Sequence, residues 1–359
     1  MSADRKVPLQ EYDAHRIALI KPSALGDIVH SLPVLTALRR RYPQAHITWI
    51  VNRSYEPLLT GHPDLDATLL FDRKAVRKGL IPALRSYGDF FRLLARQQFD
   101  LVIDLQGLLR TGLMAAATRA PRRVGFSLAR EGAPWFYTDH IPGADMKKVH
   151  AVDRYWLVCQ AFGVGDTSMT WRFPSFEAEH LWATDQLADW PQPWLMFGVG
   201  ARWVTKRWPP AHFALLARWA QTTFGGTIIF VGGSDETPMA RRVGGELTGP
   251  WLDLTGKTTL PRLAAVLALA DVMVANDTGP LHLAVALGRP VVAPYTCTKA
   301  TLTGPYGSPH VAVETRVWCQ GSYVKKCPRL ECMTELTPDR LWPVLRETLQ
   351  QWQHRRRSA

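Results

Sequence analysis

The stretch "KPSALGDIVHSLPV" at residues 21–34 decides the fold of the first part of the chain. It follows the short apolar run 16–20, which is typical of a buried strand, and from Ile28 onward apolar residues recur at helical spacing. A strand, a tight turn of small residues and a helix form the first half of a βαβ unit. Open α/β sheets bind ligands just beyond the carboxyl ends of such strands, so Asp27 lies where chemistry is expected.

The length and composition predict two domains. The chain has 359 residues, of which 47% are hydrophobic and 21% charged, and a single hydrophobic core stops growing at roughly 250–300 residues. No apolar run approaches the roughly 18–20 residues of a membrane-spanning helix, and the N-terminal segment 1–16 lacks the apolar core of a signal peptide. We therefore expect a cytoplasmic protein.

The charge predicts an anionic partner. The formal net charge is +12 and the pI is about 9.7, which suits nucleic acid, a phospholipid surface or a phosphorylated small molecule. The basic residues are scattered, and no zinc finger, RNP-type aromatic motif or long basic helix accompanies them. Charge alone leaves the three classes open, but the missing motifs lead us to expect no nucleic acid as the partner.

The cysteines indicate reduced thiols. There are five, and an odd number in a cytoplasmic chain argues against a disulfide framework. Three fall within "CQGSYVKKCPRLEC", whose gaps do not match the paired CxxC spacing of zinc ribbons. A metal site with a fourth ligand from Cys297 stays an alternative to ordinary thiols. The residues concerned are Cys159, Cys297, Cys319, Cys327 and Cys332.

Strands alternate with helices along most of the chain, which predicts two successive α/β domains with parallel sheets. A Pro- and Trp-containing passage at 165–193 separates the two series. We expect a parallel-sheet α/β domain at 1–175, a second at 176–335 and a C-terminal helix at 336–359, which Thr337 caps. The expected strands are 16–20, 46–52, 67–72, 100–107 and 122–127 in the first series, and 194–200, 227–233, 251–256, 271–277 and 290–295 in the second.

Two familiar phosphate-binding motifs are missing. The chain has no GxGxxG, which seats a dinucleotide pyrophosphate, and no GxxxxGK[ST], which forms a P-loop. Nucleoside triphosphate hydrolysis and NAD-linked hydride transfer are therefore disfavoured, and no cofactor is expected.

Two loops of the second domain are suited to bind a diphosphate. "GVGARWVTKRWP" places Lys206 after a strand and ahead of a helix, and "NDTGPLHLAVALG" places Asp277, Thr278 and Gly279 in an equivalent turn, with His282 in the first helical turn. Cationic side chains and helix N-termini both favour phosphate. Asp277 or Thr278 could instead only cap the helix, and His282 could be an ordinary surface residue.

Four segments together resemble a known family. "KPSALGDIVHSLPVLTALRRRYP" (21–43), "DLVIDLQGLLRTGL" (100–113), "TKRWP" (205–209) and "NDTGPLHLAVALGRPVVAPY" (276–295) occur in the order and at the separations found in the glycosyltransferase family 9 heptosyltransferases. The resemblance spans roughly 16–345. It implies the GT-B architecture, two Rossmann-like domains facing across a cleft, with the acceptor on the N-terminal domain and an ADP-heptose donor mainly on the C-terminal one.

The resemblance also assigns roles to residues. The family's SxxGD turn falls on Ser23, Gly26 and Asp27, with the aspartate as the catalytic base of an inverting transfer and the other two on the donor side. Asp27 could instead only cap the helix beginning at Ile28.

In the second domain the family's KxWP lysine matches Lys206, and its D-T-G-x-x-H turn matches Asp277, Thr278, Gly279 and His282. These residues are expected to bind the donor diphosphate and ribose. The transfer is expected to need no metal ion.

An anionic acceptor would suit basic residues of the first domain. Kdo and the lipid A phosphates are negatively charged, so Arg73, Lys74, Arg77 and Arg110 are expected to bind an inner-core acceptor of lipopolysaccharide. A lipid-linked acceptor would also place the protein peripherally on the inner membrane.

Departures from the family pattern leave alternatives. Arg202 and Trp203 stand where some members carry threonines, and the cysteine-bearing segment occurs only in a subset. A GT-B transferase with another nucleotide-sugar or acceptor, and a non-catalytic nucleotide-sugar-binding protein, therefore stay open.

Overall fold

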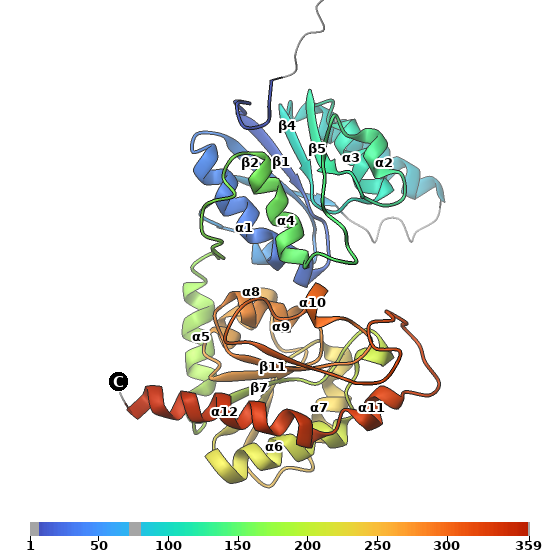
Figure 1. Cartoon of the computed structure of the whole chain (residues 1–359). Helices are drawn as coiled ribbons and strands as arrows, with labels where there is room; N and C mark the ends of the chain where they lie inside the picture. The colour runs from blue at the N-terminus through green and yellow to red at the C-terminus, as the bar shows by residue number, and fades with distance from the viewer. Residues whose placement is uncertain (1–6, 72–79, 358–359) are drawn as a thin grey trace, which may run out of the picture. The chain divides into compact units, whose positions relative to one another are not determined.

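The computed structural model describes residues 7–71 and 80–357. The chain divides into two compact units, Met1–Ser175 and Phe176–Ala359, and each is built on its own six-stranded parallel sheet. Figure 1 shows the elements of both. The two parallel-sheet domains expected from the alternation of strands and helices are confirmed.

The sheet of unit 1 has the strand order β3-β2-β1-β4-β5-β6. This is the doubly wound order in which the chain direction across the sheet reverses between β1 and β4, the place where such sheets bind ligands. The strands are β1 (Arg16–Ile20), β2 (His46–Asn52), β3 (Ala67–Phe71), β4 (Leu101–Asp104), β5 (Arg122–Phe126) and β6 (Asp139–Ile141). The helices are α1 (Leu25–Arg41), α2 (Leu80–Arg96), α3 (Leu109–Ala117) and α4 (Ala151–Ala161).

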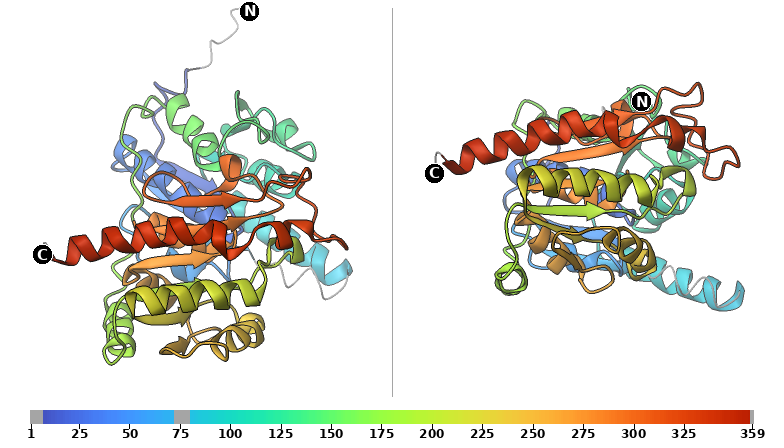
Figure 2. Two further views of the ribbon diagram at one scale, coloured as in Figure 1. Left: turned by 60° about the horizontal axis from the view of Figure 1, so that its bottom comes forward. Right: turned by 90° about the horizontal axis from the view of Figure 1, so that it is seen from below.

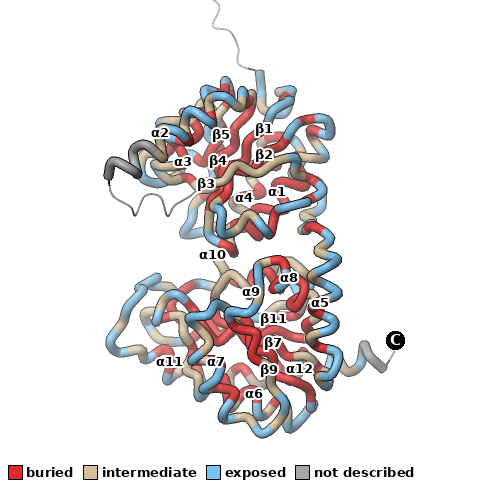
Figure 3. Tube along the Cα trace, turned by 180° about the vertical axis from the view of Figure 1, so that it is seen from behind, coloured by how far each residue is buried: buried red, intermediate tan, exposed pale blue. Residues whose placement is uncertain are grey.

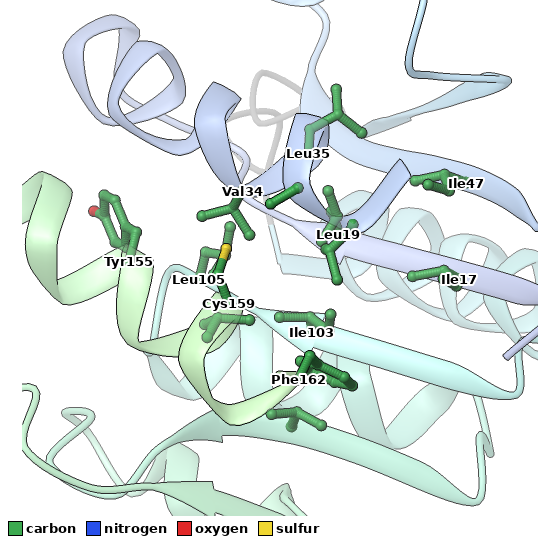
Figure 4. Close-up of a cluster of buried hydrophobic side chains, with 14 of the residues drawn as sticks. Ile17, Leu19, Val34, Leu35, Ile47, Ile103, Leu105, Tyr155, Cys159 and Phe162 are labelled. Atoms are coloured by element: carbon green, nitrogen blue, oxygen red, sulfur yellow. The ribbon is translucent and has the colours of Figure 1, made fainter. Parts of the chain in front are cut away.

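Both faces of the unit 1 sheet are covered, so its strands are apolar throughout. Along β1, Ile17 and Leu19 enter one apolar cluster, while Ala18 and Ile20 enter another on the opposite face. Helices α1 and α4 pack against each other over the first face (Figure 1). Figure 4 shows this cluster, with Tyr155 of α4 at its edge. This packing places α4 beside the N-terminal part of α1.

Unit 2 repeats the arrangement. Its sheet has the order β12-β11-β10-β7-β8-β9, with the reversal between β7 and β10. The strands are β7 (Trp194–Gly198), β8 (Thr227–Phe230), β9 (Trp251–Asp253), β10 (Val272–Ala275), β11 (Val291–Tyr295) and β12 (Val311–Glu314). The helices are α5 (Glu177–Leu187), α6 (Pro210–Phe224), α7 (Thr237–Gly244), α8 (Leu260–Ala268), α9 (Gly279–Ala286), α10 (Ala300–Thr303), α11 (Glu331–Glu335) and α12 (Pro338–Arg357). In Figure 3 the labelled strands β1, β2 and β4 of unit 1 and β7 and β11 of unit 2 run mainly as buried segments.

The last helix is part of the core of unit 2. Leu341, Leu345 and Leu349 of α12 are fully buried in the cluster that holds the strands β7, β8 and β10. Figure 2 shows α12 running beside α6, with which it is in contact. The segment 336–359 therefore belongs to the second compact unit.

Several element boundaries differ from the expectations. The expected strand 100–107 ends at Asp104, because the Asp104 carboxylate accepts hydrogen bonds from the backbone N–H groups of Gln106 and Gly107 and turns the chain. Helix α1 begins at Leu25, three residues earlier than Ile28. Strands β6 and β12 and helices α3, α10 and α11 were not expected.

Candidate functional site

Asp27 lies in the first turn of α1, just beyond the carboxyl end of β1. Its Oδ2 accepts a hydrogen bond from the backbone N–H of Ala24, 3.2 Å away. The carboxylate therefore does cap the helix, which was the alternative role expected for Asp27. The helix, however, starts at Leu25 and not at Ile28. The Asp27 side chain is nevertheless 39% exposed. Capping thus leaves the carboxylate accessible for chemistry.

A buried lysine and a tyrosine lie beside this carboxylate. Tyr155 of α4 donates its hydroxyl hydrogen bond to Asp27 Oδ1 over 2.9 Å. Lys21 Nζ donates to the Tyr155 hydroxyl over 2.7 Å and to the carbonyl oxygen of Leu105 over 3.2 Å. The same ammonium lies 3.7 Å from Asp27 Oδ1, and the Lys21 side chain is 1% exposed. The carboxylate of Asp27 thus has two hydrogen-bond donors, the Ala24 N–H and the Tyr155 hydroxyl, and one nearby cation, Lys21.

The electrostatics of this group keep Asp27 ionised. Burial by itself would raise the pKa of Asp27, but Lys21 and then His30 outweigh it and lower that pKa to about 2. Burial would lower the pKa of Lys21, but Asp27 and Tyr155 outweigh it and the pKa is raised. Burial and the nearby Asp27 raise the pKa of Tyr155, which stays a neutral donor. Asp27 is therefore a carboxylate at neutral pH.

The carboxylate opens into a small cavity of unit 1 with a volume of about 170 Å³. Arg130, after β5, and Arg154 of α4 line it together with Lys21 and Asp27. The loop 105–107 forms another part of its wall. That loop is fixed by the buried Asp104, which also accepts a hydrogen bond from the Tyr137 hydroxyl over 2.8 Å. The cavity combines one carboxylate with several cations.

In unit 2 the loops after β7 and β10 meet at a buried ion pair. Lys206, at the end of the 3₁₀ turn Val204–Lys206, places Nζ 2.6 Å from Asp277 Oδ2. Thr298 donates to the same oxygen over 2.7 Å, and His282 Nε2 lies 3.4 Å from Oδ1. Burial would raise the pKa of Asp277, but the hydrogen bond from His282 and the charge of Lys206 outweigh it and hold the pKa well below its usual range. Asp277 is thus an anion with three partners.

The turn before α9 is shaped by Asn276. This fully buried amide accepts from the backbone N–H of Trp208 and donates to the carbonyl oxygens of Val199 and Gly200, which ties the ends of β10 and β7 together. Thr278 is the N-cap residue of α9, but its hydroxyl donates to the Asn276 carbonyl and makes no side-chain cap. Neither the Asp277 nor the Thr278 side chain therefore caps α9.

The other expected residues of this turn also have defined places. Gly279 begins α9, and His282 is 6% exposed, so it is not an ordinary surface residue. A helix N-terminus, a hydroxyl and two cationic or polar side chains are thereby gathered at one edge of the sheet of unit 2.

Glu236 completes this edge of unit 2. It lies in the turn between β8 and α7, and a Cβ atom placed on Gly200 or Gly232 would overlap its carboxyl group. Only glycine lets these two strand ends approach the carboxyl so closely. Burial and the neighbouring Asp235 raise the pKa of Glu236 to about 7.

The positions of the remaining expected residues say less about their function. Ser23 lies in the turn between β1 and α1, and Gly26 in the first turn of α1. Arg110 lies in the first turn of α3, half-buried, and is not among the residues that line the cavity at Asp27. Arg73, Lys74 and Arg77 lie outside the described residues. Their acceptor roles stay predictions.

Four of the five cysteines line one cavity of unit 2, with a volume of about 660 Å³. Within the described ranges 7–71 and 80–357, no three His, Cys, Asp or Glu side chains are arranged to hold a metal ion. All five thiols are free. The four that line the cavity are Cys297, Cys319, Cys327 and Cys332.

Asp64 and Asp66 have the DxD spacing with which other glycosyltransferases hold a metal, but both bind protein donors here. Asp64 accepts from the Thr36 hydroxyl and the Arg172 guanidinium. Asp66 accepts from the Ile47 N–H and from Arg39. This pair anchors the connection between β2 and β3 and the end of unit 1.

Sequence patterns did not single out several residues at these two edges. Lys21 was visible as a basic residue after a strand, but nothing local distinguishes it from a surface lysine. Tyr155 belongs to the apolar stripe of an amphipathic helix, where tyrosine usually indicates core packing. The polar residues that follow strands offered a signal for the rest. The residues missed are Lys21, Tyr155, Glu236, Asn276 and Thr298.

Comparison with known proteins gives a consistent result. Residues 88–333 match Glycosyltransferase family 9 (heptosyltransferase). The chain is 32% identical to lipopolysaccharide heptosyltransferase 1 of Pseudomonas aeruginosa over 324 residues, which are 87% of each chain. It is 25% identical to the lipopolysaccharide core heptosyltransferase OpsX of Haemophilus influenzae over 307 residues, which are 84% of this chain and 85% of OpsX.

Solved structures show the same fold. A glycosyl transferase family 9 protein from Veillonella parvula superposes with a TM-score of 0.82 at 24% identity and covers 97% of this chain and 99% of its own. The E. coli heptosyltransferase WaaC with ADP gives a TM-score of 0.74 at 24% identity, over 93% and 99%. The expected GT-B class, with two Rossmann-like parallel-sheet domains, is thereby confirmed. This chain belongs to the glycosyltransferase family 9 of heptosyltransferases.

Proposed function

We propose that this enzyme transfers heptose from ADP-heptose to an inner-core acceptor of lipopolysaccharide, either Kdo or a heptose of a lipid A precursor, with inversion at the anomeric carbon. Relatives at 32% and 25% identity are heptosyltransferases of lipopolysaccharide. The donor is proposed because solved relatives of the same fold hold ADP and ADP-2-deoxy-2-fluoro heptose.

The observation that carries the mechanism is the ionised, accessible carboxylate of Asp27 beside a cavity that Arg130 and Arg154 also line. In the transfer, an acceptor hydroxyl oxygen bonds to the anomeric carbon, and the bond from that carbon to the diphosphate breaks. The electron pair leaves with ADP, and the hydroxyl proton passes to Asp27. A positioned base contributes about 10²- to 10⁴-fold to such a step.

Unit 2 supplies the donor side of the proposal. Lys206 offers positive charge, and Thr278 and the N-terminus of α9 at Gly279 offer donors to the diphosphate. Such preorganised groups stabilise the charge that develops on departing ADP. His282, buried against Asp277, would add a further donor.

On the side of unit 1, the proposal assigns Ser23 and Gly26, beside Asp27, to the donor. Arg130 and Arg154, which line the Asp27 cavity, join Arg73, Lys74, Arg77 and Arg110 as proposed contacts of an anionic acceptor.

A lipid-linked acceptor would place the enzyme peripherally at the cytoplasmic side of the inner membrane. In the part of the chain that the structure describes, no helix has the length and apolarity to span a bilayer. Co-sedimentation with vesicles containing anionic lipid tests the proposed attachment, and recovery of all the protein in the supernatant at low salt would contradict it.

Mass spectrometry of the product tests the function. The enzyme is incubated with ADP-heptose and Kdo-lipid A, with and without chelator, and one heptose should be added in both cases. Asp27→Asn should bind ADP-heptose as tightly as the wild type while losing about 10²- to 10⁴-fold in kcat. An unmodified acceptor with the wild-type enzyme, or full activity of the variant, would overturn the proposal.

A different nucleotide-sugar is the second candidate, and one observation favours it. The Lys206 ammonium lies 4.8 Å from the centre of the Trp203 ring, so a bulky side chain stands beside the proposed diphosphate site. Calorimetric titration with ADP-heptose, UDP-sugars and GDP-sugars separates the two. Tightest binding of ADP-heptose supports the first function.

A further inference from the structure

Three polar side chains of unit 1 form a directed chain of hydrogen bonds that ends on Asp27. The Lys21 ammonium donates to the Tyr155 hydroxyl over 2.7 Å, and that hydroxyl donates to Asp27 Oδ1 over 2.9 Å. Figure 4 shows the Tyr155 ring on α4 with its hydroxyl pointing away from the apolar cluster. The Lys21 ammonium can only donate and the ionised Asp27 carboxylate can only accept, so the order of the chain is fixed.

The core gives no reason for a lysine at this position. Lys21 is almost completely buried, and burying an ammonium carries a large desolvation cost. Replacing a buried charged group by an apolar residue of similar volume is often neutral or stabilising. Lys21 follows directly on β1, and its backbone is held by a bond from its N–H to the Ile50 carbonyl and by the Trp49 indole N–H, which donates to its carbonyl. The backbone would keep this path with an apolar side chain.

The ammonium is aimed at the carboxylate. One hydrogen bond of Lys21 Nζ goes to the Leu105 carbonyl and one to the Tyr155 hydroxyl, and Asp27 Oδ1 lies 3.7 Å away. Lys21 also lies over the Tyr155 ring, 4.6 Å from its centre. The cation therefore acts on Asp27 both through space and through the tyrosine hydroxyl.

We propose that Lys21 and Tyr155 are positioning residues for the base. Tyr155 fixes Oδ1 of Asp27 in one orientation, and Lys21 supplies the charge that keeps the carboxylate ionised while its exposed side faces the acceptor. This inference rests on the proposed role of Asp27. It adds that the activity of Asp27 depends on the two side chains that hold and charge-balance it.

Other charged groups near Asp27 are less suited to this role. His30 of α1 is buried and carries full charge only when protonated, and its influence on Asp27 is smaller than that of Lys21. Arg154 of α4 lies over the other partner, 5.3 Å from the centre of the Tyr155 ring, and lines the cavity with Arg130. Lys21 is the permanent cation that both contacts Tyr155 by a hydrogen bond and lies within 4 Å of Asp27.

The pH dependence of kcat tests the inference with Tyr155→Phe and Lys21→Met. For the wild type, activity should stay level as the pH falls until the protein unfolds, because the pKa of Asp27 is about 2. In both variants an acid limb should enter the kcat profile at higher pH than in the wild type, and the shift should be larger for Lys21→Met, because Lys21 lowers the pKa of Asp27 more than Tyr155 does. The plateau should fall about 10- to 100-fold, the effect of losing one hydrogen bond to a charged group. KM for ADP-heptose should not change.

A matched control is Tyr42→Phe. Tyr42 is also a buried tyrosine of unit 1, but its hydroxyl donates to the Tyr12 carbonyl at the other end of α1. The pH profile of kcat for Tyr42→Phe should coincide with that of the wild type. Tyr155→Phe keeps the ring and decides the question if Lys21→Met does not fold. A Tyr155→Phe profile that superimposes on the wild-type profile overturns the inference.

Two further measurements separate this failure from failure of the proposed function. If Asp27→Asn keeps full activity, the role of Asp27 as base is wrong whatever the other variants show. Titration of the Asp27 carboxyl carbon by NMR, assigned with Asp27→Asn, needs no turnover. It should show the carboxyl ionised at pH 4 in the wild type and titrating at a higher pH in Tyr155→Phe than in the wild type. Equal titration in both proteins overturns the inference even if the donor is another nucleotide-sugar.

Discussion

Lys206 and Asp277 form an ion pair in unit 2 in which Nζ and Oδ2 are 2.6 Å apart, although the two residues come from loops after different strands. The positive charge proposed for the donor diphosphate is thus already compensated by a carboxylate. In the proposed function, a diphosphate would compete with Asp277 for Lys206, and the helix N-terminus at α9 would add to the attraction. Asp277 holds the lysine in place in this structure.

Removing either partner of this pair should destabilise unit 2. Lys206→Met leaves the buried Asp277 carboxylate short of one donor, which should cost about 1–3 kcal/mol in the free energy of unfolding. Asp277→Asn should cost a similar amount. Urea denaturation of both single variants and the double variant measures the coupling. Strict additivity of the two losses would show that the contact contributes nothing.

The same substitution should weaken the binding of ADP. Lys206→Met is expected to lower the affinity about 10-fold or more, because it removes a hydrogen bond to a charged group. Calorimetric titration with ADP measures this. Arg218→Met, on α6, removes one positive charge outside the ion pair and serves as the control for net charge. Equal losses in both variants would contradict a specific role of Lys206.

Glu236 should make the stability of unit 2 depend on pH near neutrality. Its pKa is raised from 4.5 to about 7, so the folded state binds the proton more tightly than the unfolded chain. The contribution to stability is fully present below about pH 4.5 and is lost as the pH rises through 7. Glu236→Gln should remove this dependence, which amounts to about 1–2 kcal/mol because solvent screens part of it.

The measurement for Glu236 is the midpoint of urea unfolding at pH 5 and pH 8 for both proteins. From pH 5 to pH 8 the urea midpoint of the wild type should fall relative to that of Glu236→Gln, because Glu236 loses its proton in this range. Parallel changes in the two proteins would show that Glu236 titrates normally.

The bond between Tyr137 and Asp104 should stabilise unit 1. Burial raises the pKa of Asp104, and the Tyr137 hydroxyl is one of its few donors. Tyr137→Phe should therefore cost about 1–3 kcal/mol, the range for depriving a buried acceptor of a partner. Tyr42→Phe, which removes a bond to a neutral carbonyl, should cost less. Thermal unfolding of the two variants under one condition makes the comparison.

Helix α12 should be essential to unit 2 alone. Leu345→Ala removes a fully buried side chain and should cost about 2–5 kcal/mol. Hydrogen exchange followed by peptide should then accelerate in β7 and β10 and stay unchanged in β1. Leu35→Ala, in the core of unit 1, should give the reverse pattern. Equal acceleration in both units would mean that they unfold as one.

The fold was predictable because its signals are local. The run 194–198 is continuously apolar, and 47–51 is apolar except for Thr48, as expected of strands buried on both faces. β6 and β12 were missed because each is a short strand at the edge of its sheet, where β12 is only partly buried and carries little apolar pattern. The start of α1 was missed because Ala24, its N-cap residue, has no capping side chain.

Residues of the candidate site could be proposed from the sequence only where motifs mark them. Asp27, Lys206 and Asp277 each follow a strand, and this placement can be read along the chain. Tyr155 is 128 residues from Asp27 in sequence, and only the packing of α4 on α1 brings them together. Lys21 could be seen, but its near-complete burial depends on the whole of unit 1. Long-range contacts of this kind leave no local pattern.

The contribution of α12 to the core of unit 2 bears on how the protein folds as it is synthesised. Domains generally fold as units while the ribosome elongates the chain. All the strands and helices of unit 1 lie before residue 176, so unit 1 can fold while translation continues. Unit 2 has to wait until Leu341, Leu345 and Leu349 have emerged from the exit tunnel, since without them its sheet lacks part of one apolar cover. During that interval, apolar side chains that α12 later covers stay exposed on the nascent second unit.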